Sequence, residues 1–93
     1  MDEGVTAVRR RFPARVLAID DLAGRSEEFR DICRDFAEAQ SELAKWEGST
    51  EPKREERRRE YGELVAGLAK EIEDVLDRAS VLPLHRPVPR SPS

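Results

Sequence analysis

Two interleaved heptad series of apolar residues constrain the fold of this chain more than any other feature of its sequence. The members of the first series are seven residues apart, and those of the second follow three positions later each time. They are Phe29, Phe36 and Leu43, and then Ile32, Ala39 and Trp46. Apolar residues with this spacing lie on one side of an α-helix and form a seam that packs against another helix. The spacing predicts a long helix that begins after Ser26, a good N-cap residue.

A second seam follows a predicted turn. Gly48 suits the end of the first long helix, and Thr50, Glu51 and Pro52 suit the start of the next. Beyond this turn, to about Ser80, apolar residues again alternate by four and three, at Tyr61, Val65, Leu68, Ile72, Val75 and Ala79. Two consecutive helices joined by about five residues should lie antiparallel. The expected fold is therefore all-α, a coiled-coil-like antiparallel helical hairpin.

We expect nine apolar or aromatic residues to anchor this interaction seam. In an antiparallel arrangement centred near Thr50, Phe29 should meet Ile72 and Ile32 should meet Leu68. Near the turn, Trp46 should face an arginine cluster, where cation–π contacts could replace aliphatic packing. The anchors are Phe29, Ile32, Phe36, Leu43, Trp46, Tyr61, Leu68, Ile72 and Val75.

The flanking segments divide the chain into three parts. Residues 1–11 show no apolar periodicity and are expected to form a flexible basic arm. Residues 12–80 form the helical domain, which includes a short N-terminal helix from Ala14 to Ala23 closed by Gly24. Residues 81–93 contain four of the six prolines and are expected to form a disordered Pro/Arg-rich tail.

The composition fits a helical chain with a narrow core. Ala, Glu, Lys, Leu and Arg supply 48 of the 93 residues, which is typical of long helices and coiled coils. Charged residues make up 40 % of the chain, so two helices alone bury little apolar surface. We therefore expect a second copy, forming a four-helix bundle as a homodimer, or a larger protein partner. The sequence has no apolar run of membrane-spanning length and no signal-peptide pattern, so a cytoplasmic location is expected.

Several motifs follow one another over about residues 12–79: Phe12-Pro13, Ile19 with Leu22, Phe29 with Phe36, a Pro-containing turn, and the segment from Leu68 to Ile72. The order of these motifs resembles the YdcH-like family of short bacterial proteins of uncharacterised function. The resemblance implies a helical coiled-coil hairpin with an interaction role and no site residues to carry over. The chain departs from the family in a second long helix rich in Arg and Glu rather than Lys, and in its two terminal segments.

The residues that carry chemistry are too few to build an active site. His85 is the only histidine and lies in the expected tail, and Cys33 is the only cysteine and flanks the seam. Di-metal sites in helical bundles need inward Glu-x-x-His motifs, and no histidine is available on a long helix. We expect no enzyme activity, no catalytic or metal-binding residues and no cofactor.

Basic clusters leave a second function open. Arg9, Arg10 and Arg11 could contact phosphates, although the chain as a whole has a net charge of −3 and no recognised nucleic-acid-binding motif. The tail from Arg86 to Pro92 could also dock as a polyproline II segment. We therefore expect a non-enzymatic protein–protein interaction or assembly module, with a small nucleic-acid-associated regulator as the alternative.

One pair of variants should separate these two functions. Phe36→Asp is expected to dissolve an assembly held by the seam, whereas replacing Arg9–Arg11 by alanine is expected to leave it intact.

Overall fold

The structure, a computed structural model, describes the backbone of residues 2–85 and the side chains of residues 2–79. The described part is entirely helical, with four α-helices and one short 3₁₀ turn. The elements are α1 (Glu3–Arg11), η1 (Pro13–Arg15), α2 (Val16–Arg25), α3 (Glu27–Glu47) and α4 (Arg54–His85).

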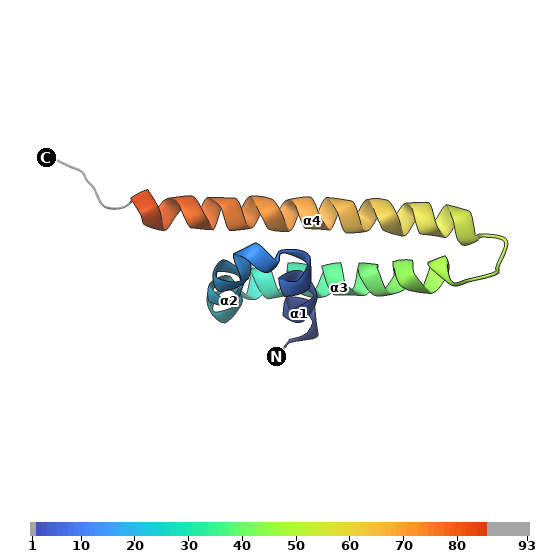
Figure 1. Cartoon of the computed structure of the whole chain (residues 1–93), viewed down its shortest axis with the longest axis horizontal. Coiled ribbons are helices and arrows are strands. Elements are labelled where there is room, and N and C mark those ends of the chain that lie inside the picture. Colours follow the sequence, from blue (N-terminus) through green and yellow to red (C-terminus); the bar gives the residue numbers. More distant parts are fainter. Residues whose placement is uncertain (1, 86–93) are drawn as a thin grey trace, which may run out of the picture.

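The two long helices, α3 and α4, run side by side in opposite directions (Figure 1). Helix α3 begins at the expected cap, where the Ser26 hydroxyl accepts a hydrogen bond from the Phe29 N–H at 3.1 Å. It ends at Gly48, as the turn signals predict. Across the turn, the Arg54 guanidinium donates to the Glu47 carbonyl oxygen at 3.1 and 3.3 Å. This contact satisfies a carbonyl that the helix end would leave unpaired.

The flexible arm expected over residues 1–11 is wrong for most of its length, because residues 3–11 form the helix α1. The Asp2 carboxylate caps this helix by accepting from the Gly4 N–H at 2.7 Å. Glu3 lies in the first turn and three arginines lie in the last turn, so both ends complement the helix dipole. Val5 and Val8, three residues apart, share one face and are buried against the rest of the chain.

Helix α2 lies at the same end of the molecule as α1, beside the C-terminal half of α4 (Figure 1). The predicted helix Ala14–Ala23 is found as η1 followed by α2, and Gly24 lies inside α2 rather than closing it. The Arg15 guanidinium, at the end of η1, pairs with the Asp77 carboxylate of α4 at 3.1 Å. The start of α2 is thereby tied to the long helix.

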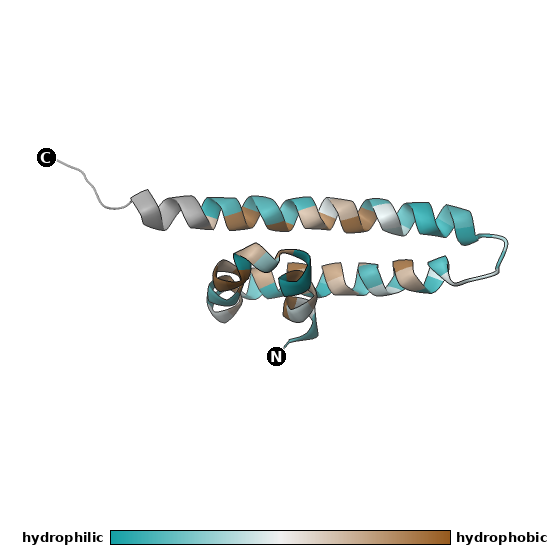
Figure 2. Ribbon diagram, in the orientation of Figure 1, coloured by the Kyte–Doolittle hydropathy of each residue, from teal (hydrophilic) through white to brown (hydrophobic). Residues whose placement is uncertain are grey.

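The core lies where α1 and α2 meet the two long helices. Apolar residues of α4 face α3 along much of its length, but its first turns are hydrophilic (Figure 2). Ten of the eleven buried hydrophobic residues of the described chain form one cluster, and Ala39 is the exception. The cluster consists of Val5, Val8, Ile19, Leu22, Phe29, Cys33, Phe36, Ala69, Ile72 and Leu76. The end of the molecule near the turn contributes none of them.

Helix α4 extends to His85, so the expected helix end at Ser80 and the disordered tail from residue 81 are wrong for residues 81–85. Pro83 lies two residues before the helix ends, and its missing N–H therefore interrupts only the final turn. The predictions for the side chain of His85 and for residues 86–93 fall outside the described part of the chain.

Candidate interaction surface

The nine predicted seam residues divide into a buried group and a half-buried group. Phe29, Phe36 and Ile72 are almost completely buried inside this single chain. The other six retain partial exposure: Ile32, Leu43, Trp46, Tyr61, Leu68 and Val75. The buried group stabilises the fold itself, so only the second group offers apolar surface to another molecule.

An open groove lies between α3 and α4. Ala39 of α3 and Tyr61, Leu64 and Leu68 of α4 form its apolar floor. Leu64 is 48 % exposed, which makes it one of two large hydrophobic side chains that the described residues leave exposed. Neither α1 nor α2 contributes a lining residue, so no other element of the described chain covers this groove.

Three carboxylates of α3 line the same groove, and we call Asp35, Glu38 and Glu42 its acidic rim. Glu42 pairs with Lys45 at 3.2 Å. Asp35 and Glu38 make no ion pair or hydrogen bond through their side chains within the described part of the chain. Two of the three rim charges are therefore uncompensated and available to a positively charged group.

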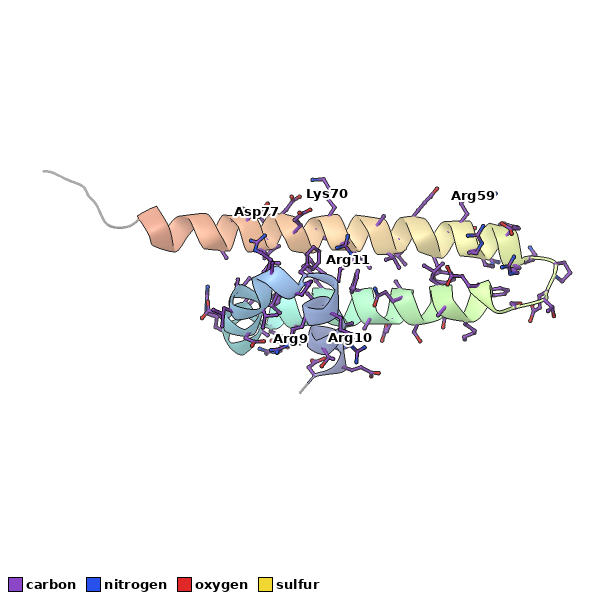
Figure 3. The ribbon with its side chains drawn as sticks, in the orientation of Figure 1. Arg9, Arg10, Arg11, Arg59, Lys70 and Asp77 are labelled. Carbon is purple, nitrogen blue, oxygen red and sulfur yellow. The ribbon has the colours of Figure 1, made fainter. Side chains whose placement is uncertain are left out.

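The three consecutive arginines of α1 do not form one basic face. Arg9 pairs with the Asp20 carboxylate of α2 at 2.5 and 2.6 Å, and the Arg11 guanidinium lies 4.8 Å from the centre of the Phe12 ring. Arg9 and Arg10 lie at the edge of the molecule away from α4, whereas Arg11 lies on the side towards α4 (Figure 3). Successive residues on a helix point about 100° apart, so this dispersal follows from the helix itself.

The expected contact between Trp46 and the arginines of α4 is not among the ring–cation contacts of the described residues. The guanidinium groups concerned have other partners. Arg57 pairs with Glu60 at 2.7 Å and Arg58 pairs with Glu55 at 2.9 Å, while Arg54 binds the Glu47 carbonyl and Glu55. A carboxylate offers each of them a stronger, charge-assisted partner than an aromatic face.

Cys33 occupies the core, as expected for a small apolar residue beside the seam. Its side chain is completely inaccessible to solvent. Burial, together with the nearby negative charge of Asp2, raises the pKa of the thiol to about 12. A thiol held in its neutral form is a poor nucleophile and a poor metal ligand.

The most important residue that the sequence analysis missed is Gly4. A Cβ atom at this position would lie 2.6 Å from the Arg34 backbone nitrogen and 2.7 Å from the Cys33 carbonyl carbon. Gly4 therefore lets the backbones of α1 and α3 approach each other closely. The sequence signals that indicate α1 are Asp2 as a helix cap and the three-residue spacing of Val5 and Val8.

Neither a membrane-spanning helix nor a metal-binding cluster is found among the described residues. No helix there combines the length and apolar character needed to cross a membrane. Over the same residues, no group of three or more His, Cys, Asp or Glu side chains is placed to hold a metal ion. No family model, curated protein or solved structure matches this chain.

Proposed function

We propose that this chain is a non-enzymatic protein–protein interaction or assembly module whose contact surface is the groove between α3 and α4. The observation that carries the proposal is the partly exposed apolar floor of this groove, in which Leu64 is 48 % exposed. An apolar side chain that is exposed within a row of apolar neighbours gains free energy when a partner covers it.

The proposal retains the coiled-coil-like helical hairpin of the sequence analysis as the interacting unit. A second copy placed over the groove would complete a four-helix bundle, and a helix of a larger protein would cover the same residues. Both agree with the interaction role implied by the resemblance to the YdcH-like family. The partly buried seam residues Tyr61 and Leu68 would become the anchors of the contact.

Nucleic-acid binding through Arg9–Arg11 receives no support from the arrangement of these residues. Arg9 already pairs with Asp20, the Arg11 guanidinium lies over the Phe12 ring, and Arg11 lies on a different side of the molecule from Arg9 and Arg10 (Figure 3). Phosphate contacts of a basic arm need several free cationic groups on one surface.

Sedimentation equilibrium with parallel measurement of helicity tests the proposal. The variant Leu64→Asp replaces the most exposed apolar side chain of the groove floor, and Leu17→Asp is the matched control. Leu17 is 87 % exposed on α2, outside the groove. Both variants replace a leucine by an aspartate and therefore add the same charge. Both are expected to retain the helicity of the wild type.

Two results support the proposal. A helical oligomer that Leu64→Asp dissociates and Leu17→Asp preserves makes the groove a contact between copies. The second result is a helical monomer, together with a protein that the wild type and Leu17→Asp retain from lysate and Leu64→Asp does not. In that case the groove is a contact with another protein. The proposal is wrong if neither self-association nor any retained protein depends on Leu64.

A further inference from the structure

We propose that the occupant of the groove is a basic amphipathic helix of another protein rather than a second copy of this chain. This inference rests on the proposed function and specifies the chemistry of the partner. The apolar floor requires an apolar stripe on the partner, and the acidic rim requires lysine or arginine residues beside that stripe.

The geometry of the floor indicates a helical occupant. Tyr61, Leu64 and Leu68 are three and four residues apart on α4, so they form a ridge along about two turns of that helix. Ala39 of α3 has a small side chain and leaves space beside this ridge. A third helix laid between two others buries such a floor through residues spaced three and four apart.

The charges around the floor select a basic partner. Asp35 and Glu38 line the groove without an ionic partner of their own in the described part of the chain. On α4, Glu60 and Glu71 lie four residues before Leu64 and three after Leu68, so they share the face of the floor. Of these two, Glu60 pairs with Arg57, whereas the Glu71 carboxylate has no ion pair with any residue whose side chain the structure describes. The unpaired carboxylates are therefore Asp35 and Glu38 on α3 and Glu71 on α4, and negative charge beside an apolar floor favours a cationic occupant.

The same charges oppose a second copy. A symmetric dimer through the groove would bring the acidic rim and Glu71 of one chain close to the same carboxylates of the other, and like charges in an interface cost free energy. A second copy that offered a different, basic surface would form a head-to-tail contact. Such contacts extend into open chains unless the rotation happens to close a ring.

A synthetic peptide of about 20 residues tests the inference, with leucines at helical positions i, i+3, i+4 and i+7 and lysines elsewhere. A matched peptide keeps the leucines and replaces each lysine by glutamate. Calorimetric titration measures affinity, and NMR of the Leu64, Leu68 and Ala39 methyl groups locates binding. We expect the lysine peptide to shift these methyl signals and the glutamate peptide to leave them unchanged.

Two variants with the same added charge separate groove binding from general attraction to an acidic protein. Leu64→Asp adds a negative charge, so non-specific attraction predicts tighter binding, whereas docking on the floor predicts affinity lowered about tenfold or more. Leu17→Asp adds the same charge elsewhere and should retain wild-type affinity. The double variant Asp35→Asn, Glu38→Gln leaves the floor intact and should weaken binding and flatten its salt dependence.

The possible failures of this inference differ from those of the proposed function. Equal binding of the glutamate peptide, or tighter binding by Leu64→Asp, overturns the basic-helix inference and leaves the groove as a contact surface. Self-association that Leu64→Asp abolishes makes the occupant a second copy, which overturns the inference and supports the proposed function. A groove that binds neither peptide and mediates neither self-association nor retention of a protein contradicts both.

Discussion

Phe36 illustrates how burial changes the role of a residue that the heptad pattern selects. Its ring is completely inaccessible to solvent within one chain, where it belongs to the central cluster. Truncating a fully buried phenylalanine costs about 3–5 kcal/mol, and placing a carboxylate there costs more. Phe36→Asp is therefore expected to unfold the chain rather than dissolve an assembly, so Leu64 is the better probe of an intermolecular contact.

Cys33 should make the stability of the protein depend on pH in the alkaline range. Its pKa is raised from 9.0 to about 12 in the folded chain. Between these values the unfolded chain loses the thiol proton and the folded chain keeps it, so the free energy of unfolding falls as the pH rises. The expected slope is up to ~1.4 kcal/mol per pH unit, and no such loss occurs below about pH 9.

Urea unfolding of the wild type and of Cys33→Ala at a series of pH values from 8 to about 10.5 measures this effect. Other groups that titrate in the same range are present in both proteins and cancel in the comparison. Stability curves that run parallel for the two proteins would contradict the buried, neutral thiol.

At the scale of the element, the packing of α1 on α3 depends on a close approach of two backbones. Gly4 lies against the backbone of Cys33 and Arg34, and backbone atoms cannot move aside as a flexible side chain can. By contrast, an added Cβ at Gly67 in α4 would meet nothing within 4 Å. The lack of a side chain therefore permits close packing at Gly4, whereas no packing at Gly67 requires it.

The substitutions Gly4→Ala and Gly67→Ala should change stability in opposite directions. Gly4→Ala forces α1 away from α3 and is expected to cost about 1–3 kcal/mol. Gly67→Ala removes a residue unfavourable in a helix and is expected to stabilise the chain by about 0.5–1 kcal/mol. Chemical unfolding of both variants provides the measurement, and destabilisation of equal size by both would contradict the close approach at Gly4.

At the scale of the whole molecule, the two ends differ in how many helices share the core. At one end, α1 and α2 pack against the long helices and supply Val5, Val8, Ile19 and Leu22 to the buried cluster. Near the turn, α3 and α4 are the only helices of the described chain (Figures 1 and 2). The first end contains the buried cluster, and the groove lies along α3 and α4 between that end and the turn, where no residue of α1 or α2 lines it.

Removal of residues 2–11 should therefore destabilise the whole molecule. Val5 and Val8 are nearly or fully buried, and the loss of two such side chains costs about 3–6 kcal/mol. We expect a lower midpoint of thermal unfolding, followed by circular dichroism, and increased binding of a hydrophobic dye.

Replacement of Arg9–Arg11 by alanine is the control for this deletion, because it keeps the valines of α1. It removes the partly exposed ion pair with Asp20, which is worth at most about 1 kcal/mol. An unchanged midpoint after the deletion would mean that residues 2–11 behave as the flexible arm predicted from the sequence.

Local patterns of the sequence determined the all-helical fold, the cap at Ser26, the end of α3 at Gly48 and the burial of Phe29, Phe36 and Ile72. Helix periodicity, capping and turn chemistry act over a few residues, so the sequence contains the signals needed to recognise them. Packing between distant segments decided the rest. Residues 3–11 are too few to form a stable helix in isolation. Their folding depends on burying Val5 and Val8 against the rest of the chain. Likewise, the heptad pattern treats Phe36 and Leu68 alike, but Phe36 is enclosed in the cluster to which α1 and α2 contribute, whereas Leu68 lines an open groove that neither of these helices covers.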